Sequence, residues 1–579
     1  MDTILPRTKA FCNQLFVLMV ERKFISRKFY GSLAVVPDSA VTGSQLIKQR
    51  SIWVCLLFFI FFFGGRFQSY SQSCGPVTFQ LNPTAQNKTI EWQKFPEFTL
   101  PFQVVYGGPR FGDTQRLPLK HGFSHLATFE AADASLPKNQ RALVWYGVAY
   151  TGTGQPWESV RSPWNNDIGL YKAKWQHELS TMPEIDLLVP DIERQIKSND
   201  SILLLKTHPA TPLAYRNFDN NTFITQYKRD LQALYAEAFG FTKANKSSRI
   251  GGYSDTPILN TYINIPGNSW QKWTTDPTLL NYLFYDFSAN KIGGEVLNRQ
   301  DFLSPSAYYY YDYPHPLAPD YLAYLLFQIE ANKAWVPDKP LIPFVWLRYS
   351  YVTDAARKFV KPFMAEATAI FPFFSGATGL WLWDDPALFT NNENFAAYEY
   401  FVNGLYRLSL YKEMFTGDYQ LVIPQPAHSY VDSRKPIWRG VAKGTDFLVA
   451  AHNPYAKDEN EVVVVEATYN NWKVNITLKG YEVFLCKFDM TLLSNEPLLP
   501  VSSFIIYPNP SQDNLQIAIN SIKAQASQLE ILDAQGRLLS KETITLVQGE
   551  NIKNVSINHL PGGLYFVKVL NQSKKFIKQ

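Results

Sequence analysis

Two carboxylates spaced two residues apart, Asp191 and Glu193, follow a short apolar run and have the side chains needed for acid–base chemistry. Side chains two residues apart on a β-strand point to the same face, so both would leave the strand on one side. A carboxylate close to a second one has its proton affinity raised, which suits it to act as a general acid. We therefore expect Glu193 to donate a proton and Asp191 to tune and orient it.

Further polar residues follow other apolar runs in the central part of the chain. Carboxylates or an arginine come after five of eight such runs, and Trp145 lies near the end of another. One acidic residue in such a place often caps a helix. Its repetition after several runs favours a shared site for a sugar or polyol instead. The residues expected there, besides the pair above, are Asp255, Asp312, Arg348, Asp384 and Trp145.

Eight short apolar runs between residues 98 and 415 predict the fold that would position these side chains. The runs cover residues 102–106, 125–129, 142–146, 185–189, 249–253, 307–311, 341–346 and 379–383. Helical spacing of apolar residues appears at 222–239, 319–334 and 355–371. Strands that alternate with helices predict an α/β fold, a (β/α)8 TIM-like barrel. Reacting groups in such barrels lie at the C-terminal ends of the strands, where the polar residues follow these runs.

The segment from Asp186 to Glu193 resembles the DGxDxDxE motif of chitinase-like glycoside hydrolases. Its first, sixth and eighth positions match, and Glu193 falls where that family places its acid. Tyr311 and Asp312 are similar to the family's Tyr-Asp pair, which steadies the substrate N-acetyl group. Trp383 resembles the tryptophan that floors a sugar subsite.

The motif also departs from the family pattern, because Leu187 replaces its glycine, Val189 replaces its middle aspartate and Pro190 interrupts the strand. The resemblance implies a glycoside hydrolase-like barrel with a retaining or substrate-assisted mechanism. Three function classes stay open: a hydrolase of an extracellular polysaccharide, a non-catalytic glycan-binding surface protein, and a hydrolase of another bond. No nucleotide, serine-hydrolase or zinc motif is present, so no cofactor or metal is expected.

Two smaller β-domains are expected after the barrel. Alternating apolar runs in 419–490 predict a β-sandwich accessory domain, and 491–502 form a linker. The last segment contains Tyr507-Pro508-Asn509-Pro510, Gly536-Arg537 and Pro561-Gly562-Gly563 in order. Residues 503–579 thereby resemble the type A C-terminal sorting domain of the type IX secretion system. The resemblance implies a small β-sandwich, the secretion machinery as a partner, and passage through the periplasm and outer membrane to the surface or medium.

The N-terminal part is consistent with export. Lys48 and Arg50 precede an apolar run at 52–63 and small residues at 69–71, the order found in a secretory signal peptide. The run is shorter than the roughly 20 residues of a membrane span, so no stable span is expected after cleavage. We expect 48–71 to be the signal peptide and 1–47 to be a misassigned N-terminal extension.

The mature chain lacks the features of a nucleic-acid-binding protein. Residues 1–71 carry nine Lys/Arg and three Asp/Glu, so the net charge of +5 belongs to the leader (+6) and leaves −1 for the rest. Neither nucleic acid nor an anionic membrane is therefore an expected partner. Only Cys74 and Cys486 follow the leader, so no disulfide framework is expected either.

Overall fold

The computed structural model describes residues 89–579 except 111–115, 128–134, 146–162, 165–167, 193–195, 210, 260–264, 266, 352, 391–392, 492–502, 522–523, 548 and 570–571. The expected N-terminal extension and signal peptide, and nearly all of the expected linker, lie outside the described residues. Among the described helices, none is long and apolar enough to cross a membrane.

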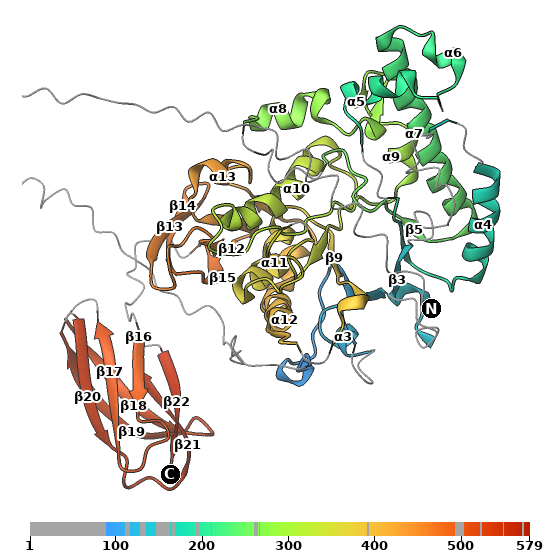
Figure 1. Cartoon of the computed structure of the whole chain (residues 1–579). Helices are drawn as coiled ribbons and strands as arrows, with labels where there is room; N and C mark the ends of the chain where they lie inside the picture. Colours follow the sequence, from blue (N-terminus) through green and yellow to red (C-terminus); the bar gives the residue numbers. More distant parts are fainter. Residues whose placement is uncertain are drawn as a thin grey trace, which may run out of the picture. The chain divides into compact units, whose positions relative to one another are not determined.

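Seven parallel strands form the central sheet, in the order β5-β4-β3-β2-β1-β9-β8. Three of them, β3, β5 and β9, are labelled in Figure 1. Most of their residues are buried, as parallel strands covered by helices require. They are β1 (Gln103–Gly107), β2 (His125–Ala127), β3 (Arg141–Trp145), β4 (Leu187–Pro190), β5 (Arg249–Ile250), β8 (Phe344–Trp346) and β9 (Gly379–Trp383). A separate antiparallel pair comprises β6 (Tyr285–Asp286) and β7 (Lys291–Ile292).

The segment 303–309 closes the sheet between β5 and β8. Parallel bridges join Tyr253 to Ser304 on one side and Ser306 to Phe344 on the other. Pro305 has no N–H to donate, so this eighth element pairs through isolated bridges and is no regular strand. Its bridges begin before the expected run at 307–311. The closed ring confirms the predicted (β/α)8 barrel.

Helices cover the outside of the barrel, and α4 and α7 lie side by side (Figure 1). α7 begins where the Asp219 carboxylate accepts hydrogen bonds from the N–H groups of Asn221 and Thr222. The helices are α3 (Leu117–Lys120), α4 (Ile168–Thr181), α5 (Asn199–Leu204), α6 (Leu213–Arg216), α7 (Asn220–Asn245), α8 (Trp270–Thr275), α9 (Glu295–Arg299), α10 (Tyr321–Trp335), α11 (Pro362–Phe374), α12 (Ala396–Ser409) and α13 (Ser429–Ser433).

One helix starts later than expected. The pattern at 355–371 predicted a helix from residue 355, but α11 begins at Pro362. Phe359 pairs with Arg348 in an antiparallel bridge, so the chain is extended just before the helix. Proline favours the first helical turn because its missing N–H would have no partner there.

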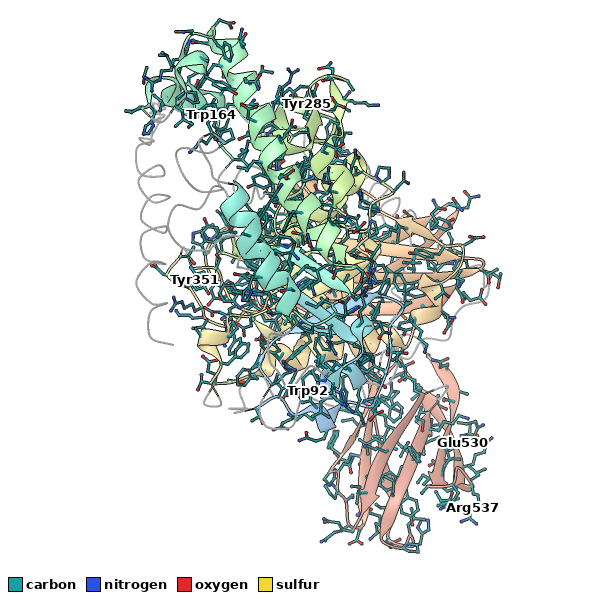
Figure 2. The ribbon with its side chains drawn as sticks, turned by 90° about the vertical axis from the view of Figure 1, so that its right-hand side faces the viewer. Trp92, Trp164, Tyr285, Tyr351, Glu530 and Arg537 are labelled. Carbon is teal, nitrogen blue, oxygen red and sulfur yellow. The ribbon has the colours of Figure 1, made fainter. Side chains whose placement is uncertain are left out.

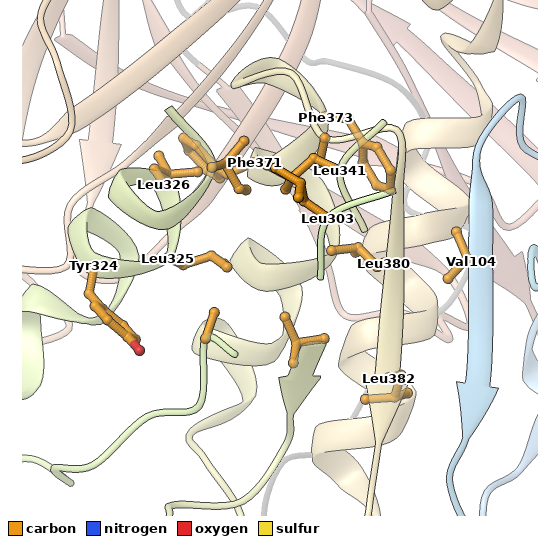
Figure 3. Close-up of a cluster of buried hydrophobic side chains, with 14 of the residues drawn as sticks. Val104, Leu303, Tyr324, Leu325, Leu326, Leu341, Phe371, Phe373, Leu380 and Leu382 are labelled. Carbon is orange, nitrogen blue, oxygen red and sulfur yellow. The ribbon is translucent and has the colours of Figure 1, made fainter. Parts of the chain in front are cut away.

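Two hydrophobic cores hold the barrel, one on each side of its strands. The inner core fills the lumen with Val105, Ala142, Val144, Leu187, Val189, Phe302, Ile342, Phe344 and Trp381. The outer core lies between the strands and helices such as α10 and α11 (Figure 3). Figure 3 shows Val104, Leu303, Tyr324, Leu325, Leu326, Leu341, Phe371, Phe373, Leu380 and Leu382 in it. Neighbouring strand residues such as Val104 and Val105 thus serve different cores.

A β-sandwich follows the barrel and packs against it. Its larger sheet has the order β10-β11-β12-β15, and its smaller sheet pairs β13 with β14. The buried Arg439 guanidinium of β11 lies 2.7 Å from the Glu330 carboxylate of α10, which joins the sandwich to the barrel. The strands are β10 (Gln420–Val422), β11 (Ile437–Lys443), β12 (Asp446–His452), β13 (Val462–Tyr469), β14 (Trp472–Lys479) and β15 (Val483–Asp489).

One cysteine of the sandwich is cross-linked. Cys486 of β15 is disulfide-bonded. A single bond agrees with the expectation that no framework of several disulfides holds this fold.

The C-terminal segment forms a second β-sandwich, with its own core that includes Phe504, Ile517, Val567 and Phe576. Its antiparallel sheets have the orders β16-β17-β20 and β19-β18-β21-β22. The strands are β16 (Ser503–Tyr507), β17 (Asn514–Ser521), β18 (Gln525–Asp533), β19 (Leu538–Leu546), β20 (Gly549–Ser556), β21 (Gly563–Val569) and β22 (Gln572–Lys578). The predicted fold class, a barrel followed by two β-sandwiches, is therefore confirmed.

Candidate functional site

Asp191 lies directly after β4, at the C-terminal end of the barrel. Leu187 and Val189 belong to the lumen core, so the alternation along the strand places Asp191 on the lumen side as well. Its N–H donates to the Trp145 carbonyl of β3 at 3.2 Å, and only 2% of the residue is exposed. Glu193, the expected general acid, lies outside the described residues.

Five aromatic rings, here called the mouth cluster, gather at the same end of the barrel: Tyr253, Tyr308, Trp346, Tyr351 and Trp383. Tyr308 is central, since its ring stacks on Trp383 (centroids 5.6 Å apart, 21° between planes). It also meets Trp346 edge-on at 5.6 Å and Tyr253 at 6.2 Å. Trp346 in turn lies 5.0 Å from both Trp383 and Tyr351 (Tyr351 is labelled in Figure 2). All but Trp346 are partly exposed.

A buried polar network supports the mouth cluster from behind. Asp384 accepts hydrogen bonds from Trp346 Nε1 (2.7 Å), Tyr398 Oη (2.7 Å) and Arg348 Nε (3.1 Å). Burial raises the pKa of Asp384 above its usual value, although Arg348 and the other donors favour the charged form. Arg348 is shared with Glu393, whose carboxylate lies 2.6 Å from Nη2.

Arg348 and Asp384 were expected to contact substrate, but both are buried, with 2% and 1% of their surface exposed. They fix the indole of Trp346 instead. Asp385 lies nearer the surface, where it accepts a hydrogen bond from Tyr351 Oη at 2.7 Å. It also caps a short 3-10 helix by accepting from the Ala387 N–H at 2.9 Å, the ordinary role of such a residue.

Tyr311 and Asp312 lie on the helix side of the sixth element. Tyr311 stacks on the His315 ring at 4.1 Å, with 9° between the planes. Asp312 accepts a hydrogen bond from Tyr349 Oη at 2.9 Å and lies 3.5 Å from Lys361 Nζ. Lys361 occupies the N-cap position of α11, so these contacts hold Asp312 beside the start of that helix.

Trp145 and Asp255 also point away from the lumen. Trp145 donates from Nε1 to the Glu178 carboxylate of α4 at 2.7 Å, on the helix side of β3. A Cβ placed on Gly252 would meet both Phe239 of α7 and Asp255 Oδ2 within 3 Å, so Asp255 faces α7. Burial raises the pKa of Asp255 to about 8. Its Oδ2 has no hydrogen-bond partner among the described residues.

The first aspartate of the motif lies at the opposite end of β4. Asp186 Oδ2 is 2.9 Å from His125 Nε2 and accepts from Arg249 Nη2 at 2.5 Å. Burial acts to raise the pKa of Asp186, but the hydrogen bonds from Arg249 and His125 hold it below its usual value. The amino ends of barrel strands are positions of stability and not of catalysis. Asp186 therefore ties β2, β4 and β5 together, far from Asp191 along the strand.

Four members of the mouth cluster were not expected from the sequence: Tyr253, Tyr308, Trp346 and Tyr351. Tyr253, Tyr308 and Trp346 lie in the apolar runs or at their ends, so alternation from the lumen residues could have found them. Tyr351 comes from the loop after β8, which carries no such periodicity. Among the described residues, no group of three His, Cys, Asp or Glu side chains could hold a metal ion.

Comparison with known proteins identifies the C-terminal domain. Residues 505–579 match the model of the secretion system C-terminal sorting domain, which confirms the sorting domain expected at 503–579. It indicates export to the cell surface or the medium. No curated protein sequence matches this chain.

Three solved structures match this chain at low similarity. Bee venom hyaluronidase is 12% identical, covers 53% of this chain and 99% of its own, and gives a TM-score of 0.37. An endo-β1,6-glucanase is 9% identical (71% and 93% covered, TM-score 0.31). A glycosyl hydrolase family 2 member from Bacteroides cellulosilyticus is 10% identical (84% and 61% covered, TM-score 0.24). The barrel assignment rests on the strand pairing of this chain itself.

Proposed function

We propose that the mouth of the barrel binds a glycan outside the cell and hydrolyses it by carboxylate acid–base chemistry. The mouth cluster is the observation that carries this proposal. Four partly exposed aromatic side chains at the C-terminal end of a (β/α)8 barrel offer apolar faces with polar edges, the surface that a sugar ring requires. The sorting domain puts this site where extracellular polysaccharides are found.

Hydrolysis is assigned to Asp191 and Glu193 at the end of β4. Asp191 is buried on the lumen side, and the Tyr253 N–H of the mouth cluster donates to the carbonyl of the preceding Pro190 at 3.3 Å. We propose that Glu193, two residues further on, protonates the leaving glycosidic oxygen. Asp191 raises the proton affinity of Glu193 and orients its side chain. Residues 98–415 then form the catalytic domain and 419–490 the accessory domain.

Glycan binding is tested by replacing a ring of the mouth cluster. Trp383→Ala removes the face that stacks on Tyr308, and affinity for the bound polysaccharide should fall about tenfold, the effect of losing roughly 1.4 kcal/mol. Trp472→Ala is the matched control, because Trp472 is also partly buried but packs in the sandwich. Equal affinities of the two variants in an affinity electrophoresis panel would refute the assignment of the mouth.

Catalysis is tested separately with Glu193→Gln, which keeps the side-chain shape and removes the transferable proton. General acid–base assistance contributes about 10²–10⁴-fold, so reducing-sugar release should fall by that order while binding persists. Glu295→Gln, at an exposed helix position, is the control for the same chemical change. Unchanged turnover in Glu193→Gln would eliminate this residue as the acid.

The non-catalytic alternative predicts a different pattern in the same experiments. A glycan-binding surface protein would lose affinity on Trp383→Ala, yet the wild type would release no sugar from any polysaccharide that it binds. The buried carboxylate beside the mouth cluster favours the enzyme.

A further inference from the structure

A hairpin at the C-terminal end of β8 carries an arginine in a conformation unusual for its type. The Arg357 N–H donates to the Tyr349 carbonyl at 2.9 Å, and the Tyr349 N–H donates to the Lys358 carbonyl at 2.9 Å. Two residues thus face one, which is a β-bulge. Arg357 has a φ of +66°, in the left-handed region that glycine adopts far more readily than a long side chain does.

The fold holds this backbone from both sides. Besides the N–H bond to Tyr349, the Arg357 carbonyl accepts from Nη1 of the buried Arg348 at 3.1 Å. Bulges commonly occur next to active sites because they re-aim a side chain. Here the bulge directs the guanidinium over the Tyr351 ring, 5.0 Å from its centroid. Tyr351 belongs to the mouth cluster, so the charge lies at the rim of the proposed glycan site.

The two arginines of the hairpin differ in how their charge is satisfied. Arg348 is buried and pairs with Asp384 and Glu393. Arg357 is exposed, and within the described part of the chain no carboxylate lies within 4 Å of its guanidinium. A guanidinium presents a planar fork that fits a carboxylate or a sulfate with two parallel hydrogen bonds. Stacking on Tyr351 restricts its motion and leaves the fork open to such a group.

We infer that Arg357 is an anion-recognition residue of the barrel mouth, and that the glycan bound there carries carboxylate or sulfate groups. The inference rests on the proposed function and specifies its substrate class. A sugar ring stacked on the mouth cluster would place its charged substituent against the guanidinium, so neutral glycans would lose this contact. The strained backbone of Arg357 then serves specificity and not stability, as strain at functional sites often does.

The test compares charged polysaccharides with neutral forms of the same polymer, using the full-length chain. Alginate and polygalacturonate carry carboxylates alone, and their carboxyl-reduced derivatives are neutral. Chondroitin 4-sulfate in its carboxyl-reduced form carries sulfate alone, so it separates the two anions. Dissociation constants are measured at low and high salt, because an exposed ionic contact is screened as salt increases.

Two variants remove the charge in different ways. Arg357→Gln keeps most of the side-chain length, and Arg357→Gly fits the left-handed backbone, so a folding defect cannot explain a shared loss. Lys358→Gln is the matched control, since the neighbouring exposed cation loses the same unit of charge. We expect the wild type to prefer at least one charged polymer about tenfold over its reduced form, with both Arg357 variants losing that preference and Lys358→Gln keeping it.

Three results would overturn the inference while leaving glycan binding intact. These are equal affinity of the wild type for charged and reduced polymers, a preference retained without Arg357, and an equal loss in Lys358→Gln. If no polymer binds and Trp383→Ala changes nothing, the proposed function fails together with the inference.

Discussion

Replacement of Asp255 by asparagine should stabilise the protein at neutral pH, because the buried carboxyl group is held uncharged at a cost. Its pKa is raised to about 8 by burial, against an unfolded value near 3.8. At pH 7 the unfolded chain has released this proton and the folded chain has kept it. Because pH 7 lies about three units above the unfolded pKa, ionisation of this group stabilises the unfolded chain and not the folded one. At 1.36 kcal/mol per pH unit, this lowers the free energy of unfolding by about 4 kcal/mol.

The sign follows from proton uptake. Because the folded state binds more protons than the unfolded state between about pH 4 and pH 8, the stability due to this group is full below pH 4 and is lost as the pH rises. An asparagine at this position would be neutral at every pH and similar in size. The free energy of unfolding of Asp255→Asn should therefore match that of the wild type near pH 4 and exceed it by about 4 kcal/mol at pH 7.

Urea unfolding at pH 4, 5.5 and 7, followed by tryptophan fluorescence, measures this difference. Asp276→Asn is the control, because Asp276 is a surface cap whose pKa is lowered by hydrogen bonds from Thr278, and its loss should bring no gain at neutral pH. A difference between Asp255→Asn and wild type that stays constant from pH 4 to pH 7 would refute the reasoning. It would mean that Asp255 is charged in the folded protein.

The remaining predictions concern the sandwich contact and export. His452 is fully buried with its pKa lowered to about 4, so stability should fall by roughly 3 kcal/mol as the pH drops from about 6.5 to 4, and His452→Asn should remove this dependence. Arg439→Ala leaves a buried carboxylate without its partner and should cost about 3–5 kcal/mol in thermal or urea unfolding. Mass spectrometry of the exported protein should find termini near Gln72 and Ser502; a C-terminal domain retained on every surface molecule would contradict this. Peptides from residues 1–45 should be absent from the cell proteome, and recovery of one would disprove the expected start.

Controls for the two sandwich variants come from the same interface. Tyr321→Phe removes the hydroxyl that bonds His452 Nε2 at 2.8 Å and leaves the imidazole in place, so the pH dependence should persist in it. Arg407→Gln tests an ion pair with Glu366 in which 23% of the arginine side chain is exposed, against 0% for Arg439, and it should cost less than Arg439→Ala because water reaches the arginine end of the pair. Equal losses in the two arginine variants would show that burial does not set the cost.

Patterns along the chain were enough to predict those features that depend on neighbouring residues. Apolar runs such as 379–383 and the helical spacing at 319–334 predicted a barrel. A strand that is buried on both faces is apolar along its whole length, so neighbouring residues are enough to recognise it. The turn motifs of the C-terminal segment identified the sorting domain for the same reason. The end of the apolar run also predicted correctly that Asp191 follows its strand. Its spacing of two residues from Val189 determines the face of the strand on which it lies.

Which side chains meet at the mouth depends on the closed barrel and could not be predicted in the same way. Trp145 follows Val144 by one residue, and that single step puts it against α4 and not in the lumen. Asp255 comes after Ser254, whose φ of +57° turns the chain before the carboxylate and breaks the strand alternation. Tyr351 and Arg357 reach the mouth through a hairpin bulge that no periodicity encodes. Closing the barrel brings together residues more than a hundred positions apart, and the register of that closure is set by packing across the lumen, which no local pattern contains.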